Sequence, residues 1–255
     1  MTQCIYNTLR VLIIGDIHCR LDNFTDIDVL TDKILKIINQ EHPDWIVLLG
    51  DLLHTHEQVN TLCLNKLLDL FDKLRKYAKL YIIVGNHDMI NSAQFLSTHH
   101  WMNMLKEWSN VTIVDKPLIE THCSKTYTFL PYVPKGRFME ALYTLDENAW
   151  NKSSAIFCHQ EFRGSQYVGK TSDDGDYWAE EYPQIISGHI HKHQILKNVY
   201  YVGSAIQVTF GETDKNIVSV FTSENGSDVK IEEILLDVPK KLTINTDLIN
   251  IENLN

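Results

Sequence analysis

The sequence predicts an α/β fold with a largely parallel sheet that is closed by a second sheet. Over the first 85 residues, short apolar runs alternate with amphipathic stretches, as in consecutive βαβ units. Five apolar runs along the chain end in glycine or directly in histidine, and polar residues follow at once. Apolar runs near the C-terminus alternate with polar residues, as antiparallel strands do.

Three strands and two helices are expected in the first part of the chain. Residues 10–14, 45–49 and 80–84 have the length and composition of buried strands. Between them, residues 31–40 and 62–77 carry apolar side chains at helical spacing. This order implies parallel strands joined by right-handed crossovers. The carboxyl ends of the strands should therefore lie at one edge of a sheet, where Gly85 allows the chain to turn sharply.

Further strands and two helices are expected in the second part. The expected strands are residues 111–114, 126–130, 154–159, 182–187, 199–205, 217–222 and 229–236, and the expected helices are residues 93–108 and 137–150. We expect the last three strands to be closing antiparallel strands of a second sheet. Residues 164–178 should form a surface loop near the polar edge. Because no repeat or linker interrupts residues 1–241, they are predicted to be one domain, followed by a short polar tail at residues 242–255.

Composition indicates a globular protein in a reducing, intracellular setting. The 255 residues are 44% hydrophobic and carry a net charge of −10, which argues against extensive DNA contacts but not against an acidic metal site. The five cysteines are scattered and form no Cys-x-x-Cys pair, so they suggest neither a zinc knuckle nor a disulfide framework. No N-terminal run is long enough for a signal peptide or a membrane span. A cytoplasmic, nuclear or nucleoid location is expected.

The polar residues at the strand ends are of metal-binding types. They are Asp16, His18, Asp51, Asn86, His159, His189 and His191. Nitrogen and oxygen donors without a thiolate suit Mn, Fe, Zn or Mg rather than a structural zinc. Seven ligands are too many for one ion, but two ions that share a carboxylate would use them. Such a pair lies roughly 3.5–4 Å apart and stabilises displacement at phosphorus.

Each of these motifs also has an ordinary explanation when taken alone. Asp16 could cap a helix, and Gly85-Asn86 could be a simple turn after a strand. Repetition at five strand ends favours the metal interpretation. His99 and His100 lie away from these strand ends and are expected to be surface or packing residues, and His193 is expected to be exposed.

The motifs Asp16-x-His18, Gly50-Asp51, Gly85-Asn86-His87-Asp88, a strand-end His159 and Gly188-His189-x-His191 resemble those of the metallophosphoesterase (calcineurin-like) superfamily. The resemblance implies a two-sheet β-sandwich flanked by helices. It implies one metal held by Asp16, His18, Asp51 and His191, and a second held by Asp51, Asn86, His159 and His189, with Asp51 bridging. It further implies that His87 protonates the leaving oxygen or stabilises its charge, and that Asp88 orients His87.

A narrower set of segments looks like the SbcD-type DNA double-strand-break repair nucleases. It comprises Gly50-Asp51-Leu52-Leu53-His54, the Phe129-Leu130-Pro131-Tyr132-Val133-Pro134 run, His159-Gln160, and Gly188-His189-Ile190-His191 followed by Tyr200-Tyr201-Val202-Gly203-Ser204-Ala205-Ile206-Gln207. This likeness implies that His54 is a further catalytic residue. It also implies manganese-dependent DNA cleavage and an SMC-like ATPase partner of the SbcC type. A DNA-capping domain and C-terminal ATPase-binding helices are not evident in the sequence.

The function expected from the sequence is therefore a dinuclear-metal phosphodiesterase. It is expected to act as a DNA nuclease or exonuclease of the double-strand-break repair type, by attack of a metal-bridging hydroxide on phosphorus. Two divalent ions are expected, with Mn²⁺ favoured and Mg²⁺, Fe and Zn²⁺ open. A cyclic-nucleotide or other small-molecule phosphodiesterase and a non-enzymatic scaffold are the alternatives. A homodimer stays open, and no membrane partner is expected.

Overall fold

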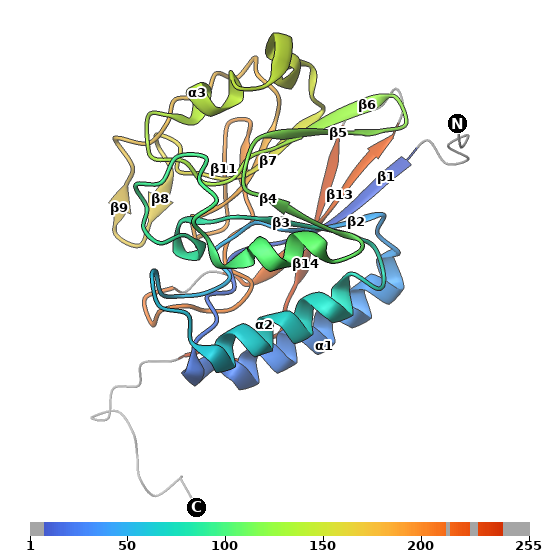
Figure 1. Ribbon diagram of the computed structural model, residues 1–255, viewed down its shortest axis with the longest axis vertical. Coiled ribbons are helices and arrows are strands. Elements are labelled where there is room, and N and C mark those ends of the chain that lie inside the picture. The colour runs from blue at the N-terminus through green and yellow to red at the C-terminus, as the bar shows by residue number, and fades with distance from the viewer. Residues whose placement is uncertain (1–7, 213–214, 225–228, 242–255) are drawn as a thin grey trace, which may run out of the picture.

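Two six-stranded sheets form the centre of the molecule (Figure 1). The computed structural model describes residues 8–212, 215–224 and 229–241. The predicted tail, residues 242–255, lies outside the described residues. None of the helices in the described ranges has the length and apolar character needed to cross a membrane.

The first sheet has the strand order β14-β13-β1-β2-β3-β4. Its strands are β1 (Thr8–Ile14), β2 (Trp45–Leu48), β3 (Lys79–Ile83), β4 (Val111–Val114), β13 (Ile217–Glu224) and β14 (Lys230–Leu235). Strands β1 to β4 are parallel, and the helices α1 (Phe24–Glu41) and α2 (Thr61–Leu74) connect the first three of them. The predicted βαβ units are confirmed.

The second sheet has the strand order β11-β12-β10-β7-β6-β5. Its strands are β5 (Leu118–His122), β6 (Lys125–Phe129), β7 (Ala155–His159), β10 (Ile185–Gly188), β11 (Gln194–Leu196) and β12 (Val199–Tyr201). The four inner strands are parallel, and the edge strands β5 and β11 pair antiparallel with their neighbours. The prediction that residues 217–222 and 229–236 belong to this sheet was wrong, because β13 pairs antiparallel with β1 and places both strands in the first sheet.

Aromatic and aliphatic side chains fill the space between the sheets, and helices cover their outer faces. The ring of Tyr81 on β3 stacks on that of Phe129 on β6, with the ring centroids 4.4 Å apart. Helices α1 and α2 lie side by side and bury Ile34 and Phe71 against the first sheet (Figure 1). The short helix α3 (Phe138–Leu142) contributes to the cluster on the far face of the second sheet. This is the two-sheet sandwich flanked by helices that the sequence predicted.

The two helices predicted in the middle of the chain are largely absent. Only a 3₁₀ helix, η3 (Trp101–Glu107), forms within residues 93–108. Ser97 is one reason, because its hydroxyl accepts a hydrogen bond from the backbone N–H of His99 and so competes with helical bonding. Residues 137–150 divide into α3 and the 3₁₀ helix η4 (Asp146–Lys152).

Smaller elements complete the fold. The predicted loop at residues 164–178 contains a two-stranded hairpin of β8 (Gln166–Tyr167) and β9 (Lys170–Thr171). Two further 3₁₀ helices, η1 (Leu21–Asn23) and η2 (Asn86–Asp88), directly follow the polar ends of β1 and β3. Cys123 is disulfide-bonded, which the scattered cysteine pattern did not predict.

Candidate metal centre

All seven predicted metal ligands lie together where strands from both sheets end. Asp16 and His18 follow β1, Asp51 follows β2, and Asn86 follows β3. His159 is the last residue of β7 in the second sheet, and His189 and His191 follow β10. Asp16, His18, Asp51, Asn86 and His159 are buried, and the two remaining histidines are partly buried. The parallel order of the strands explains this convergence, because their carboxyl ends meet at one edge.

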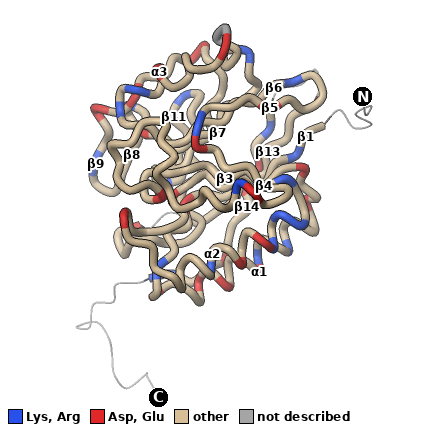
Figure 2. Tube along the Cα trace, in the orientation of Figure 1, with Lys and Arg blue, Asp and Glu red and all other residues tan. Residues whose placement is uncertain are grey.

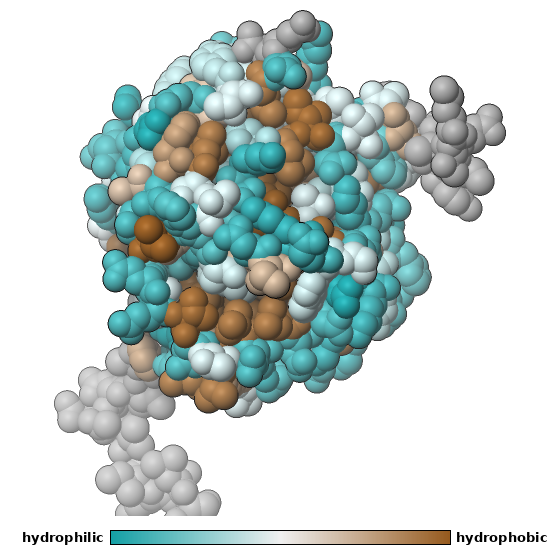
Figure 3. All heavy atoms as spheres, in the orientation of Figure 1, coloured by the Kyte–Doolittle hydropathy of each residue, from teal (hydrophilic) through white to brown (hydrophobic). Residues whose placement is uncertain are grey.

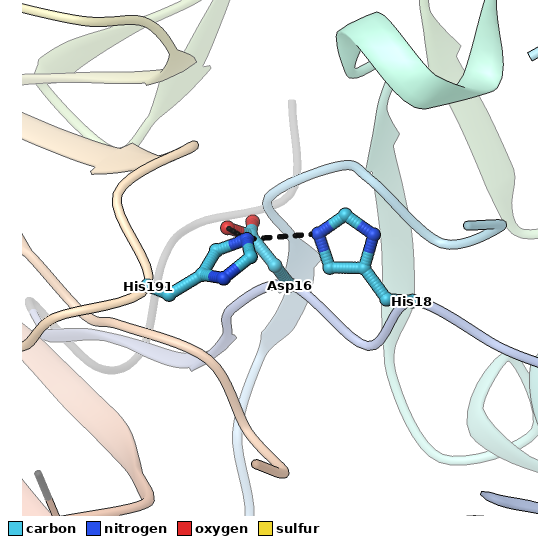
Figure 4. Close-up of side chains that lie close together, drawn as sticks. All are labelled: Asp16, His18 and His191. Carbon is cyan, nitrogen blue, oxygen red and sulfur yellow. Dashed lines mark hydrogen bonds and ion pairs between the residues drawn. The ribbon is translucent and has the colours of Figure 1, made fainter. Parts of the chain in front are cut away.

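Asp16, His18 and His191 form one group of potential ligands (Figure 4). The Nε2 atoms of the two imidazoles are 2.9 Å apart, and Asp16 Oδ2 is 3.9 Å from His191 Nε2. Asp51 Oδ2 lies 3.6 Å from His18 Nε2. These atoms face a common point from two sheets.

Asp51, Asn86, His159 and His189 form the second group. Asn86 Oδ1 is 2.8 Å from His189 Nδ1 and 3.1 Å from His159 Nε2. Asp51 Oδ1 lies 3.3 Å from His159 Nε2. Asp51 thus directs one carboxylate oxygen to each group, which is the geometry of a bridging ligand.

The donor atoms in these groups fit a divalent cation better than they fit one another. Asp16 Oδ2 is buried and forms no hydrogen bond within the described part of the chain, which is unusual for a buried carboxylate oxygen. The Nε2 atoms of His18 and His191 face each other. A hydrogen bond between them uses a single N–H, so one of the two nitrogens carries no proton at this contact. Imidazole nitrogens with carboxylate and amide oxygens are suitable ligands for Mn, Fe, Zn or Mg.

Three of the site residues hold a left-handed backbone conformation. The φ angles are 47° at His18, 50° at Asp51 and 74° at His189. Such angles are uncommon for residues other than glycine and cost about 1–3 kcal/mol each. Local interactions hold them in place, since the backbone N–H of His18 donates to the carbonyl oxygen of Asp51 at 2.9 Å. Three of the nine non-glycine residues with positive φ in the described ranges are therefore predicted ligands.

Two glycines allow the strand ends to approach one another closely. A Cβ atom at Gly85 would lie 2.3 Å from both N and Oδ1 of Asp51, and a Cβ atom at Gly188 would lie 2.6 Å from Asp16 Oδ1. Gly85 has an extended backbone with φ −84°, so it is needed for this close approach and not for the sharp turn expected from the sequence.

The charges in the centre are set by burial and by carboxylate–imidazole contacts. Burial raises the pKa of Asp16 to about 6, and the neighbouring His159 reduces this effect. Burial also opposes ionisation of Asp51, but His159 and other histidines hold its pKa well below the usual value. Burial alone would lower the pKa of His159, whereas Asp51 raises it to about 9. Asp51 is therefore an anion near neutral pH, as a metal ligand must be.

His87 lies beside the first group with one ring nitrogen already engaged. Its Nδ1 is 2.6 Å from the carbonyl oxygen of His54, and its Nε2 is 4.0 Å from Asp51 Oδ2. The His54 ring is close to His18, with centroids 5.4 Å apart. The ring of His56 stacks on that of His87 at 4.4 Å, a contact that no motif in the sequence marked. The side chain of His87 is 27% exposed, so a substrate can reach it.

Asp88 acts on the backbone around the site. Its carboxylate accepts hydrogen bonds from the backbone N–H groups of Leu52 and Gly85, both at 3.1 Å, and from Trp101 Nε1 at 3.1 Å. These bonds tie the segment after β2 to the segment after β3. The His87 ring bonds to the His54 carbonyl instead, so the contacts of Asp88 reach His87 only through the main chain. The catalytic role predicted for Asp88 stays a prediction.

Two glutamates next to the centre were not predicted. Glu212 Oε1 is 2.8 Å from His191 Nδ1, and Glu161 Oε2 is 3.6 Å from His189 Nε2. Glu161 follows His159 by two residues, which is a weak signal in the sequence. Glu212 belongs to none of the motifs. His193, which was expected to be exposed, is 10% exposed in its side chain and contacts Glu233 at 2.9 Å, so that prediction was wrong.

Comparison with known proteins agrees with this geometry. Residues 9–193 match the model of the family described as calcineurin-like phosphoesterase. "Putative phosphoesterase 244L" of Invertebrate iridescent virus 6 is 42% identical over 94% of this chain and 86% of its own length. "Putative phosphoesterase 078R" of Invertebrate iridescent virus 3 is 41% identical over 92% of this chain and 68% of its own length.

More distant similarities concern part of the chain or the fold alone. "Exonuclease subunit 1" of Enterobacteria phage T4 is 26% identical over 52% of this chain and 39% of its own length. The crystal structure of a phosphatase from Mycoplasma pneumoniae superposes with a TM-score of 0.50, at 10% identity, over 92% of this chain and 96% of the other. From the family match, the two viral relatives and the strand-end ligands together, the chain belongs to the calcineurin-like phosphoesterase family.

Proposed function

We propose that this chain is a phosphodiesterase with two divalent metal ions and that its substrate is DNA. The observation that carries the two-metal proposal is the position of Asp51, whose carboxylate oxygens face two separate groups of nitrogen and oxygen donors. Membership of a phosphoesterase family supports the reaction class. The phage exonuclease subunit among the relatives supports a nucleic-acid substrate, and DNA is our choice within that class.

The chain's own residues divide between the two ions. Asp16, His18 and His191 would hold one ion, Asn86, His159 and His189 the other, and Asp51 both. Bound ions would neutralise the phosphate and lower the pKa of a water molecule so that it can attack phosphorus near neutral pH. Mn²⁺ is our first choice, with Mg²⁺, Fe and Zn²⁺ also compatible with these donor types.

His87 is proposed to supply the proton for the leaving oxygen. The carbonyl oxygen of His54 accepts a hydrogen bond from Nδ1–H, so His87 would act as the acid in its imidazolium form, giving the proton on Nε2 to the leaving oxygen and becoming neutral. The stacked ring of His56 limits rotation of the imidazole. The backbone carbonyl group of His54 orients the His87 ring. We also propose a direct catalytic role for the His54 side chain.

An open cavity lies beside His87. A cavity of about 570 Å³ extends from His87 past Val59 and Ile90 to His99 and Trp101. Figure 3 shows apolar areas separated by a hydrophilic band on one face, and Figure 2 shows basic and acidic residues interspersed along α1 and α2.

The net charge of −10 provides little general attraction to DNA. We therefore propose that a partner, an SMC-like ATPase of the SbcC type, supplies DNA binding.

A small phosphodiester such as a cyclic nucleotide is the second candidate. A separate cavity of about 230 Å³ adjoins the centre and is lined by Tyr167, Val168, His189, His191, Lys192 and Glu212. Its small size, the Tyr167 ring and the Lys192 ammonium group favour a compact phosphorylated molecule. The same metal centre would serve both substrates.

A substrate panel with Mn²⁺ or Mg²⁺ distinguishes the two candidates. The panel contains single- and double-stranded DNA, RNA, cyclic nucleotides and an aryl phosphodiester. We expect metal-dependent cleavage of DNA, abolished in Asp51→Asn. Hydrolysis of cyclic nucleotides without DNA cleavage would favour the second candidate. Cleavage of the aryl ester alone would reject the DNA proposal, and no hydrolysis with any metal would favour a scaffold.

A further inference from the structure

We propose that Glu161 and Glu212 are positioning residues that determine which ring nitrogen of His189 and of His191 binds metal. The inference rests on the two-metal centre of the proposed function. Each glutamate faces one histidine of the Gly188-His189-Ile190-His191 segment, and each faces a different ring nitrogen.

Glu212 is held firmly on the Nδ1 side of His191. Its Oε1 is 2.8 Å from that nitrogen, and its Oε2 accepts a hydrogen bond from the backbone N–H of Val208 at 2.7 Å. The hydroxyl of Thr209 donates to Oε1 at 3.3 Å. The carboxylate is 12% exposed, so little water competes for it. Because its position is fixed by the backbone, it fixes the plane of the His191 ring.

Glu161 occupies the corresponding place on the Nε2 side of His189. Tyr167 donates its hydroxyl proton to Oε2 at 2.6 Å, Ser172 donates to Oε1, and Lys135 Nζ lies 2.9 Å from Oε2. With three donors the buried carboxylate is fully held. The distance between Glu161 Oε2 and His189 Nε2 is 3.6 Å, which is within the range of an ion pair but too long for a hydrogen bond. We therefore expect Glu161 to act more weakly than Glu212.

The two contacts have opposite consequences for the two rings. A neutral imidazole has one N–H, and a carboxylate that accepts it leaves the lone pair of the other nitrogen for a metal. Glu212 thus leaves Nε2 of His191, the atom that faces His18 at 2.9 Å. The Glu161 carboxylate lies 3.6 Å from Nε2 of His189 and favours the N–H there by its charge rather than by a direct hydrogen bond, which leaves Nδ1, the atom that faces Asn86 Oδ1 at 2.8 Å. Each metal group receives the nitrogen that points to it.

The chain provides a matched control for a purely structural contact. Glu233 lies 2.9 Å from Nε2 of His193, two residues beyond His191, and Lys215 also pairs with Glu233. His193 belongs to neither metal group. Removing the Glu233 carboxylate therefore removes a histidine–glutamate contact of the same kind without affecting a predicted metal ligand.

The test is a calorimetric titration of the metal-free full chain with MnCl₂. We expect two ions in the wild-type protein, one ion weakened roughly 10–100-fold in E212Q, and a smaller loss for the other ion in E161Q. Metal-free thermal unfolding of each variant reports whether the fold is retained, and E233Q should bind Mn²⁺ like the wild type. Unchanged affinities in folded E212Q and E161Q would overturn the positioning role alone. A wild-type chain that binds no Mn²⁺ would overturn the metal centre as well.

A crystal structure of the Mn²⁺-loaded chain gives an independent readout. Nδ1 of His189 and Nε2 of His191 should lie at metal-binding distance, with Glu161 and Glu212 on the opposite nitrogens. E212D, which retains the charge on a shorter side chain, should recover part of the affinity lost in E212Q. Metal bound through Nδ1 of His191, or a Glu212 carboxylate turned away from the ring, would contradict the proposal.

Discussion

His87 differs from the other histidines of the centre because its neighbours leave it a single free nitrogen. Burial lowers the pKa of His87, and the nearby Asp51 opposes that shift. Its Nδ1 is engaged by the His54 carbonyl. The side chain is therefore suited to exchange a proton at Nε2. Nε2 also lies near the ligand atoms of His18 and Asp51, but the proposal assigns His87 to neither metal group.

Replacing His87 should separate proton transfer from metal binding. In His87→Ala we expect both ions to remain, because the two ligand groups are intact, and turnover to fall by about 10²–10⁴-fold. Elemental analysis measures the metal, and initial rates on the cleaved substrate measure turnover. His42→Asn, which changes an exposed histidine at the C-terminal end of α1 and outside this cavity, is the control. Loss of metal in His87→Ala, or normal turnover, would contradict the assigned role.

At this scale the sequence identified seven candidate ligands, which the structure brings together, but it did not indicate the residues that support them. Asp16, Asp51 and Asn86 each follow a buried apolar run, so local sequence places them at a strand end. Glu212 reaches His191 through folding of the loop after β12, and nothing in its immediate sequence signals that contact. His56 could not be distinguished from an ordinary loop histidine, because its stacking depends on where η2 places His87.

Among the elements, the end of β4 is tied to η3 through the buried carboxylate of Asp115. Asp115 Oδ2 lies 3.2 Å from His100 Nε2 and 2.5 Å from Lys106 Nζ. Burial opposes ionisation of Asp115, but hydrogen bonds from His100 and Lys106 lower its pKa to about 2. His100 is thus a packing residue, as predicted, and its contact holds η3 against the first sheet.

Asp115→Asn should destabilise the protein in a pH-dependent manner. The pKa of Asp115 is lower in the folded protein than in the unfolded chain, so its ionised form stabilises the fold above about pH 4. We expect a loss of about 1–2 kcal/mol at pH 7, which diminishes as the pH falls from about 4 towards 2. Urea unfolding at pH 7 and pH 3 measures it. Asp146→Asn, at an exposed position in η4, should change little. An equal loss at both pH values would exclude the ionic mechanism.

The helices and strands were predictable where apolar residues recurred at a clear helical or strand spacing. Both crossover helices and the parallel strands of the first sheet follow from this spacing. The helix predicted at residues 93–108 does not form, because polar side chains there make hydrogen bonds with the backbone, as Ser97 does with the N–H of His99. The prediction that β13 belongs to the second sheet was wrong. Alternation of apolar and polar residues indicates a strand but does not identify the strand it pairs with, which is β1.

At the scale of the molecule, the centre joins the two sheets. Asp16, Asp51 and Asn86 follow strands of the first sheet, whereas His159 and His189 belong to the end of the second. An ion bound to both sets favours the packed arrangement over any state in which the sheets separate. Metal binding should therefore be coupled to global stability.

Removal of metal should lower the melting temperature. A ligand at 100 times its Kd adds about 2.7 kcal/mol, and for a protein of this size each kcal/mol shifts Tm by about 2–4 °C. We expect Tm to rise by about 5–10 °C per ion when saturating Mn²⁺ is added to the EDTA-treated protein, as measured by calorimetry. Asp51→Asn should lose most of this shift. The same shift in that variant would place metal binding elsewhere.

The pairing of β1 with β13 has a consequence for how the chain folds. Thr8 lies opposite Glu224, so a strand near the start of the chain forms its outer pairing with one near the end. Contacts between residues so distant in sequence slow folding, since a long loop must close before they are gained. During synthesis β1 to β4 can assemble early with the β13 side of β1 still open. That exposed strand edge is a site for mispairing until residues 217–224 of β13 emerge.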